Sequence, residues 1–346
     1  MRRRRMRPTR AGLLLATALS VLSLVAAGCG AAPRASGSAR RAVVPAGVRV
    51  DGLDVGGLEG ADVEAAVAGL AAQLARPPRN AYVDPSTHGL VPGVDGVELN
   101  VPATVAALLS ARPRSEVAPV LRELPPSITL AQLPAAPIYN GPPERRAVAF
   151  VINVAWGDQY IPAMLRTLTA DQAAATWCFV GRWAETHPDL VREIVAAGRA
   201  DPGGFTYCNH GYRDHGWALL GEPQALASIA AADGVITDLT GQTPRYFSPH
   251  RGEWNPAVLA ASRASGHELV LWSLDTIDWK NPTASSLRVR IGHRVKAGDI
   301  VLMHPTAPTA EALAGMIQAA RAKGLTLITL DRLLSPRRGP WDGGVG

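Results

Sequence analysis

The chain has 346 residues, of which 47% are hydrophobic and 18% charged, and this is the composition of a folded protein rather than a disordered one. The length exceeds that of one ordinary compact domain. The net charge of +6 lies largely in an N-terminal group of arginines, Arg2–Arg5, Arg7 and Arg10. The remainder is close to neutral, so a basic surface for nucleic acid is not indicated and we expect no nucleic-acid partner.

An apolar run from Ala11 to Ala27 follows these arginines and ends in small residues before Cys29. A basic region, an apolar region and a small-residue site describe an export signal. The segment before Cys29 resembles a lipobox, whose cysteine is lipidated, although Ala26 stands where leucine is usual. We therefore expect residues 1–29 to be a signal peptide with a lipobox. Ordinary secretion and a retained transmembrane anchor are the alternatives.

This interpretation predicts an exported lipoprotein on the outer face of the cytoplasmic membrane or in the cell wall. Its contact with the membrane would be an N-terminal lipid or the signal anchor. The two remaining cysteines, Cys178 and Cys208, are too few for a disulfide framework. They can pair outside the membrane or stay as buried thiols, and the sequence leaves both open.

Residues 30–45 have no periodicity and predict a flexible tether. Beyond them the pattern predicts a short strand region and two helices at residues 61–74 and 103–109. The string GVRVDGLDVGGLEGADVEAAVAGLAAQL, followed by GVELNVPATVAALL, resembles a small domain type assigned to peptidoglycan binding, here covering residues 46–133. An α+β spacer that binds nothing is the alternative.

A proline-rich linker at residues 134–146 separates this region from a second domain at residues 147–335, and residues 336–346 are expected to be a disordered tail. Within the second domain, apolar strands alternate with helical segments. Strands are predicted at 147–154, 175–180, 205–208, 246–248, 268–272, 299–303 and 325–329. Helices are predicted near 161–168, 188–197, 223–240, 256–265, 284–294 and 311–323. This alternation predicts a parallel sheet covered by helices, with six or seven units suggesting a barrel.

In barrels the chemistry lies at the carboxyl ends of the strands. The segments that follow the predicted strands are NVAWGD (153–158), NHGYRDH (209–215), SPHRGE (248–253), DTIDW (275–279) and MHPT (303–306). In spacing and order they resemble the five motifs of the NodB-type polysaccharide deacetylases, and most closely a sporulation-associated subgroup. The resemblance implies an α/β fold, a deformed (β/α) barrel preceded by a small α+β domain.

The reaction implied by the resemblance is hydrolysis of an N-acetyl group from a glycan. A divalent metal, usually zinc, is held by a carboxylate and two histidines, lowers the pKa of its bound water and polarises the amide carbonyl. A second carboxylate acts as base, and a histidine on a late strand protonates the leaving amine. Peptidoglycan or a related glycan is the implied partner.

The motifs of this chain depart from that scheme. The adjacent carboxylates of the first motif fall at Ala155 and Trp156, and neither side chain can act as a base or bind a metal. Asp158 is the nearest acid and the candidate replacement. His304 matches the proton-donating histidine, and Asp275 is a further candidate catalytic residue.

The metal ligands are also altered. His210 matches the first metal histidine, but Asp214 stands at the position expected for the second, with His215 beside it. A zinc site needs three protein ligands and an open position, so a third would come from Asp158 or His250. In the third motif Ser248 replaces an arginine.

Candidate glycan contacts are Trp156, Asp278, Trp279 and Arg251, because aromatic rings at strand ends can stack on sugars. Three functions remain open from the sequence. They are a metal-dependent deacetylase with a rearranged site, an inactive deacetylase fold that binds peptidoglycan, and a structural protein of a spore coat or envelope.

Overall fold

The computed structural model describes residues 42–200, 204–214, 216–339 and 342. The expected signal peptide, Cys29 and most of the tether lie outside the described residues, as does His215. Within the described part of the chain, no helix is both long and apolar enough to cross a membrane.

The N-terminal described residues form a small α+β region. Strand β1 (Arg49–Val50) pairs with β2 (Leu53–Asp54) and, in parallel, with β6 (Glu116–Val117). Three helices accompany these strands, α1 (Gly60–Ala68), α2 (Ala71–Leu74) and α3 (Val101–Leu109). Valine and leucine side chains from both element types form one buried cluster. The helix expected over 61–74 is divided at Gly69 and Leu70.

Two antiparallel strand pairs come from the same part of the chain. Strand β3 (Tyr82–Val83) pairs with β4 (Leu90–Val91), and β5 (Gly96–Leu99) pairs with β7 (Leu121–Leu124). The buried Ile138 then forms bridges to Leu90 on one side and to Val270 on the other. The proline-rich segment 134–146 is therefore packed into the sheet at this point.

The second half of the chain builds a parallel sheet. Its strands are β8 (Ala147–Val154), β9 (Ala175–Phe179), β10 (Phe205–Asn209), β11 (Tyr246–Phe247), β12 (Glu268–Leu269), β13 (Leu274–Asp275), β14 (Ile300–Met303) and β15 (Thr326–Leu327). Their order is β12-β11-β10-β9-β8-β14-β13, and β15 pairs with the start of β8. Every residue of β8 is buried, as expected for a parallel strand covered on both faces.

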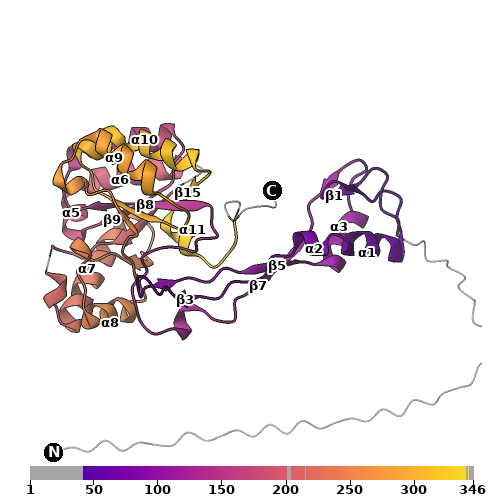
Figure 1. Ribbon diagram of the computed structural model, residues 1–346, viewed down its shortest axis with the longest axis horizontal. Coiled ribbons are helices and arrows are strands. Elements are labelled where there is room, and N and C mark those ends of the chain that lie inside the picture. Colours follow the sequence, from indigo (N-terminus) through magenta and orange to yellow (C-terminus); the bar gives the residue numbers. More distant parts are fainter. Residues whose placement is uncertain (1–41, 201–203, 215, 340–341, 343–346) are drawn as a thin grey trace, which may run out of the picture. The chain divides into compact units, whose positions relative to one another are not determined.

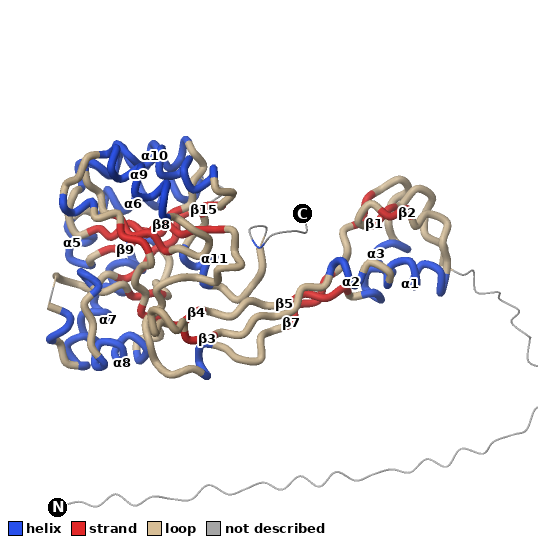
Figure 2. Tube along the Cα trace, viewed as in Figure 1, coloured by secondary structure: helices blue, strands red, loops and turns tan. Residues whose placement is uncertain are grey.

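Helices surround this sheet (Figures 1 and 2). They are α4 (Ile161–Ala170), α5 (Gly181–Thr186), α6 (Pro188–Ala200), α7 (Glu222–Thr240), α8 (Pro256–Ala264), α9 (Ala284–Arg294), α10 (Ala307–Ala322) and α11 (Leu330–Leu334). Apolar side chains of α4, α5, α6, α7, α9 and α10 and of the strands form the main core, and those of α8 and α11 lie in two further buried clusters. The expected deformed (β/α) barrel is confirmed, and its strand order brings the carboxyl ends of β8, β10, β13 and β14 to one end of the sheet.

Cys178 and Cys208 form a disulfide between β9 and β10, so the pairing that the sequence leaves open is realised. The two residues are direct neighbours in the register of the parallel strands. They are separated by 30 residues in the sequence, and a disulfide that closes a loop of this length stabilises a fold by about 3.6 kcal/mol in the chain-entropy model.

The fully buried Arg145 contacts described residues near the C-terminus. Its guanidinium donates to the carbonyls of Leu333 and Arg337, both at 2.9 Å, and forms an ion pair with Asp342 at 3.2 Å. The described residues of the expected disordered tail are thus held by side-chain contacts.

Candidate functional site

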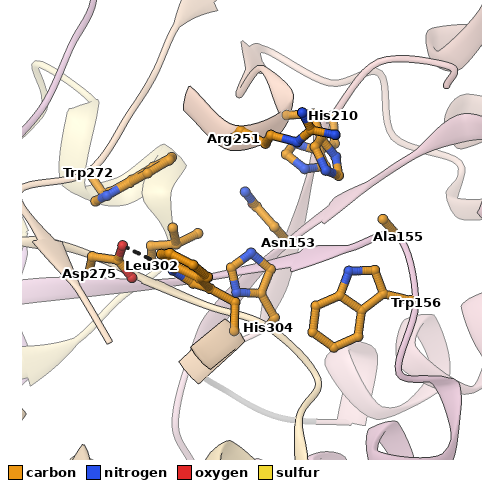
Figure 3. Close-up of a pocket in the computed structure, with 11 residues that line it drawn as sticks. Asn153, Ala155, Trp156, His210, Arg251, Trp272, Asp275, Leu302 and His304 are labelled. Carbon is orange, nitrogen blue, oxygen red and sulfur yellow. Dashed lines mark hydrogen bonds between the residues drawn. The ribbon is translucent and has the colours of Figure 1, made fainter. Parts of the chain in front are cut away.

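A cavity of about 430 Å³ opens at the carboxyl ends of the barrel strands (Figure 3). It is lined by polar, aromatic and two aliphatic side chains. They are Asn153, Ala155, Trp156, His210, His250, Arg251, Trp272, Asp275, Trp279, Leu302 and His304. The sequence-predicted residues Trp156, His210, Arg251, Asp275, Trp279 and His304 are therefore brought together.

The imidazole of His304 is held by the carboxylate of Asp278. His304 Nδ1 lies 2.8 Å from Asp278 Oδ1, and the backbone N–H of His304 donates to Oδ2 at 2.6 Å. The hydroxyl of Thr309 donates to the same Oδ2 at 2.6 Å. Asp278 is fully buried and does not line the cavity, so it positions His304 rather than contacting a sugar as the sequence analysis expected.

Trp156 stacks on the face of the same imidazole, whose edge is bonded by Asp278. The ring centroids of Trp156 and His304 are 5.7 Å apart and the ring planes differ by 9°. The loops that carry Trp156 and His304 lie in close contact. A Cβ atom added to Gly157 would lie only 1.9 Å from the carbonyl oxygen of Pro305. Only glycine allows this approach, and its φ of +83° is one that glycine adopts at little cost.

His210 lies across the cavity from His304 (Figure 3). Its Nδ1 bonds the carbonyl oxygen of Ser248, which fixes that nitrogen as the donor and leaves Nε2 with its lone pair. Burial, reinforced by the neighbouring charge of His250, lowers the pKa of His210 to about 3. The ring is therefore neutral at physiological pH.

His250 lies beside His210, with ring centroids 5.0 Å apart. Burial also lowers the pKa of His250, against the opposing effect of Asp214. Asp214 itself is partly exposed and pairs with Arg251, whose Nη2 lies 3.1 Å from Asp214 Oδ2. The same Oδ2 lies 3.5 Å from His250 Nε2. Asp214, which the sequence analysis offered as a metal ligand, is not part of the cavity lining, and its carboxylate contacts Arg251 and His250.

The candidate catalytic residues Asp275 and Asp158 differ in their position relative to the cavity. Asp275 lines the cavity, where its Oδ1 accepts from the backbone N–H of Ile277 at 2.7 Å and its Oδ2 from Trp279 Nε1 at 3.5 Å. Asp158 is exposed, begins a short 3₁₀ turn and is not part of the cavity lining. The structure therefore does not place the candidate base beside His304, and a left-handed residue, Gly157, separates Asp158 from the cavity residue Trp156.

The described residues do not fit the expected zinc site. Among them no group of three His, Cys, Asp or Glu side chains is placed to hold a metal ion. The first-motif positions hold Ala155 and Trp156, and Asp214 faces Arg251. His210 and His250 alone supply two imidazoles where three ligands are needed.

Comparison with known proteins agrees with this architecture. A family model described as "Polysaccharide deacetylase" matches residues 140–270. The protein YlxY of Bacillus subtilis (strain 168), itself uncharacterized, is 31% identical over 75% of this chain and 80% of its own length. The chain belongs to the polysaccharide deacetylase family.

Other members of the family include both a protein named as an enzyme and one described as a pseudoenzyme. A peptidoglycan-N-acetylglucosamine deacetylase of Bacillus cereus is 25% identical over 56% of this chain and 70% of its own length. The solved structure of BA3943 from Bacillus anthracis, described as a CE4 family pseudoenzyme, is 29% identical and has a TM-score of 0.68. That alignment covers 81% of this chain and 97% of the other.

Two residues of this deacetylase-family cavity escape the sequence analysis as site candidates, namely Asn153 and Leu302. Asn153 immediately precedes the last residue of β8, and this position is the one signal for it in the sequence. Its amide oxygen is buried without a hydrogen-bond partner in the described chain, a property that no sequence pattern reports.

The buried, neutral state of His210 predicts a pH dependence of stability. The folded pKa of about 3 lies below the ordinary 6.5, so between these pH values the unfolded chain binds a proton that the folded chain does not. The free energy of unfolding should then fall as pH decreases through this window, by up to about 1.4 kcal/mol per pH unit. We expect His210→Gln to lose less stability than the wild type between pH 7 and pH 4 in urea titrations.

The exposed His293→Gln serves as the matched control for loss of one histidine. Equal pH slopes for His210→Gln and the wild type would show that His210 does not carry this dependence.

Proposed function

We propose that this protein is a polysaccharide deacetylase-like protein that engages N-acetylated cell-wall glycan in the cavity between His210 and His304. The observation that carries the proposal is the fixed His304, held by buried Asp278 inside an aromatic-walled cavity at the strand ends. Exposed tryptophan faces beside polar groups are suited to sugar rings, whose apolar faces stack on aromatic side chains.

Recognition of the glycan is the function that the geometry supports best. The family's hydrolytic route needs a carboxylate base and a carboxylate metal ligand, and the side chains at these positions are Ala155 and Trp156. The structural similarity to BA3943, described as a pseudoenzyme, supports the same conclusion.

Hydrolysis of the N-acetyl group is the second candidate. It is favoured by His304, whose Nδ1 is engaged by Asp278 so that Nε2 is the nitrogen available to a leaving amine. Several relatives named as deacetylases of peptidoglycan support the same bond as the target.

Glycan recognition predicts retention on insoluble peptidoglycan. Trp279 lines the cavity and is 53% exposed, so Trp279→Ala removes a stacking surface. We expect the wild type to co-sediment and the variant to bind about five- to tenfold more weakly, since aromatic contacts contribute about 1 kcal/mol. Leu219→Ala, at a 91% exposed position outside the cavity lining, is the control. Wild-type protein that stays in the supernatant would remove the proposal.

Introducing carboxylates at positions 155 and 156 is expected to produce deacetylase activity. We expect Ala155→Asp combined with Trp156→Asp to release acetate from N-acetylated glycan when zinc is added, at a rate well above that of the wild type. A BA3943 mutant described as having restored enzymatic activity supports this design. The matched control, Ala155→Asn with Trp156→Asn, has similar volume without charge. If the wild type itself releases acetate, at the same rate as the aspartate variant, the native chain is a hydrolase.

We also propose export and anchoring through a lipid on Cys29, from the basic and apolar N-terminal sequence. The Cys178–Cys208 disulfide supports an oxidising location, where such bonds persist. We expect the wild type in the membrane fraction of expressing cells and Cys29→Ser in the soluble exported fraction, as judged by immunoblot. An unchanged membrane fraction for Cys29→Ser would contradict lipidation.

A further inference from the structure

A second cavity, of about 320 Å³, lies at the amino ends of β11 and β12, at the opposite end of the barrel from the cavity that holds His304. Arg245, Tyr246 and Glu268 line it from the barrel side. Pro92 and Pro126, from the segments that follow β4 and β7, line it from the other side. That second wall lies outside residues 140–270, the part of the chain that the family model matches.

The hydroxyl of Tyr246 is a polar group that the protein leaves for a ligand. Tyr246 is 4% exposed, and its ring packs in the same buried cluster as Leu333 and Leu334. No hydrogen bond joins the hydroxyl to another described residue, yet the atom is not among those sealed in the core without a partner. Because a buried polar group is normally bonded, an open and unpaired hydroxyl in a cavity wall indicates a binding role. Burial raises its pKa, so the group stays neutral.

Two opposite charges lie beside this hydroxyl. Glu268 is the register partner of Tyr246 in the parallel pair β11–β12, so the two side chains share one face of the sheet. Arg245 comes directly before β11, and the charges of Arg245 and Glu268 act on the pKa of Tyr246 in opposite directions.

Neither charge is compensated by an ion pair in the described part of the chain. The guanidinium of Arg245 is exposed and the carboxylate of Glu268 is partly buried. Asp331 also lies near Arg245, but it is not part of the cavity lining and forms no ion pair with the guanidinium. The cavity therefore presents one cation and one anion that a ligand can engage.

These groups complement a short zwitterionic peptide. A free carboxylate accepts two parallel hydrogen bonds from a guanidinium, and a free ammonium donates to a carboxylate. The neutral hydroxyl of Tyr246 can bond a peptide carbonyl or N–H. Leu130 and Leu334 add apolar lining that suits small side chains such as the methyl of alanine.

We propose that the cavity lined by Arg245, Tyr246 and Glu268 binds a short peptide that carries both a free ammonium and a free carboxylate, as the stem peptides of peptidoglycan do. The site is separate from the cavity between His210 and His304. It rests on the proposed function only for the source of the peptide, and it gives the protein a second contact with the same polymer. No bond is made or broken in this binding.

Calorimetric titration with L-lysyl-D-alanyl-D-alanine at low ionic strength tests the site. Two matched ligands remove one kind of charge each, namely the peptide with both amines acetylated and the peptide with a carboxamide at its end. We expect each capped peptide to bind the wild type at least about tenfold more weakly than the free peptide, because each loses a charge-assisted hydrogen bond.

Single substitutions assign each charge to its partner. Arg245→Gln should bind the free and the carboxamide peptides about equally and keep its preference for free amines. Glu268→Gln should show the converse pattern. Arg294→Gln, at an exposed position outside the lining, removes one positive charge elsewhere and should keep both preferences. Thermal denaturation checks that the variants are folded, and the comparison of the three peptides on the wild type does not depend on them.

The outcomes separate this inference from the glycan function, because the peptide carries no sugar. A wild type that binds the three peptides equally, or binds none of them, overturns the site. Preferences that persist in folded Arg245→Gln and Glu268→Gln also overturn it. Retention on peptidoglycan without binding of the free peptide overturns the inference and leaves the proposed function intact. Binding of the peptide with both preferences, by a protein that peptidoglycan does not retain, supports the site and removes the proposed function.

Discussion

The geometry of the site depends on one buried carboxylate. Asp278 has no exposed surface, and its two oxygens accept from the imidazole and backbone of His304 and from the hydroxyl of Thr309. A buried charge is tolerated only when it is paired and hydrogen-bonded. The same bonds join the turn after β13 to the end of β14 and to α10. They also offset the strain at Ile277, a β-branched residue held at a φ of 61°.

The aromatic wall depends on the same anchor. His304 is held on one edge by Asp278, so its face is presented to Trp156 at a nearly parallel angle. The close approach of Gly157 to Pro305 brings the two loops together, and a side chain at residue 157 would push them apart. The deacetylase-family scaffold thus keeps its late histidine in place while a tryptophan occupies part of the space beside it.

The sequence predicts the barrel well because long apolar strands and amphipathic helices have distinct periods. It predicts the meeting of His210, Asp275, Trp279 and His304 because carboxyl ends of parallel strands share one edge. It misses β13, whose two residues are too short for any period. It does not reveal that Asp158 lies outside the cavity lining, beyond the left-handed residue Gly157.

Other features depend on contacts between distant segments. The Cys178–Cys208 bond requires the register of β9 against β10, which the residues of neither strand specify alone. The unpaired oxygen of Asn153 is likewise visible only when its surroundings are known. The separate role of Asp278 belongs to the same class, because its motif does not reveal that the side chain turns inward, toward Thr309.

Loss of the first-motif carboxylates changes the electrostatic character of the whole cavity. An anion beside the imidazoles would favour their protonated forms or a bound cation. With Ala155 and Trp156 in those positions, burial dominates and the pKa of His210 and of His250 falls. The cation of Arg251 is matched by Asp214, and the carboxylate of Asp275 accepts bonds from its own turn. The described residues supply no third metal ligand for this cavity, and the imidazole lone pairs of His210 and His304 are suited to the hydroxyl and amide donors of a sugar.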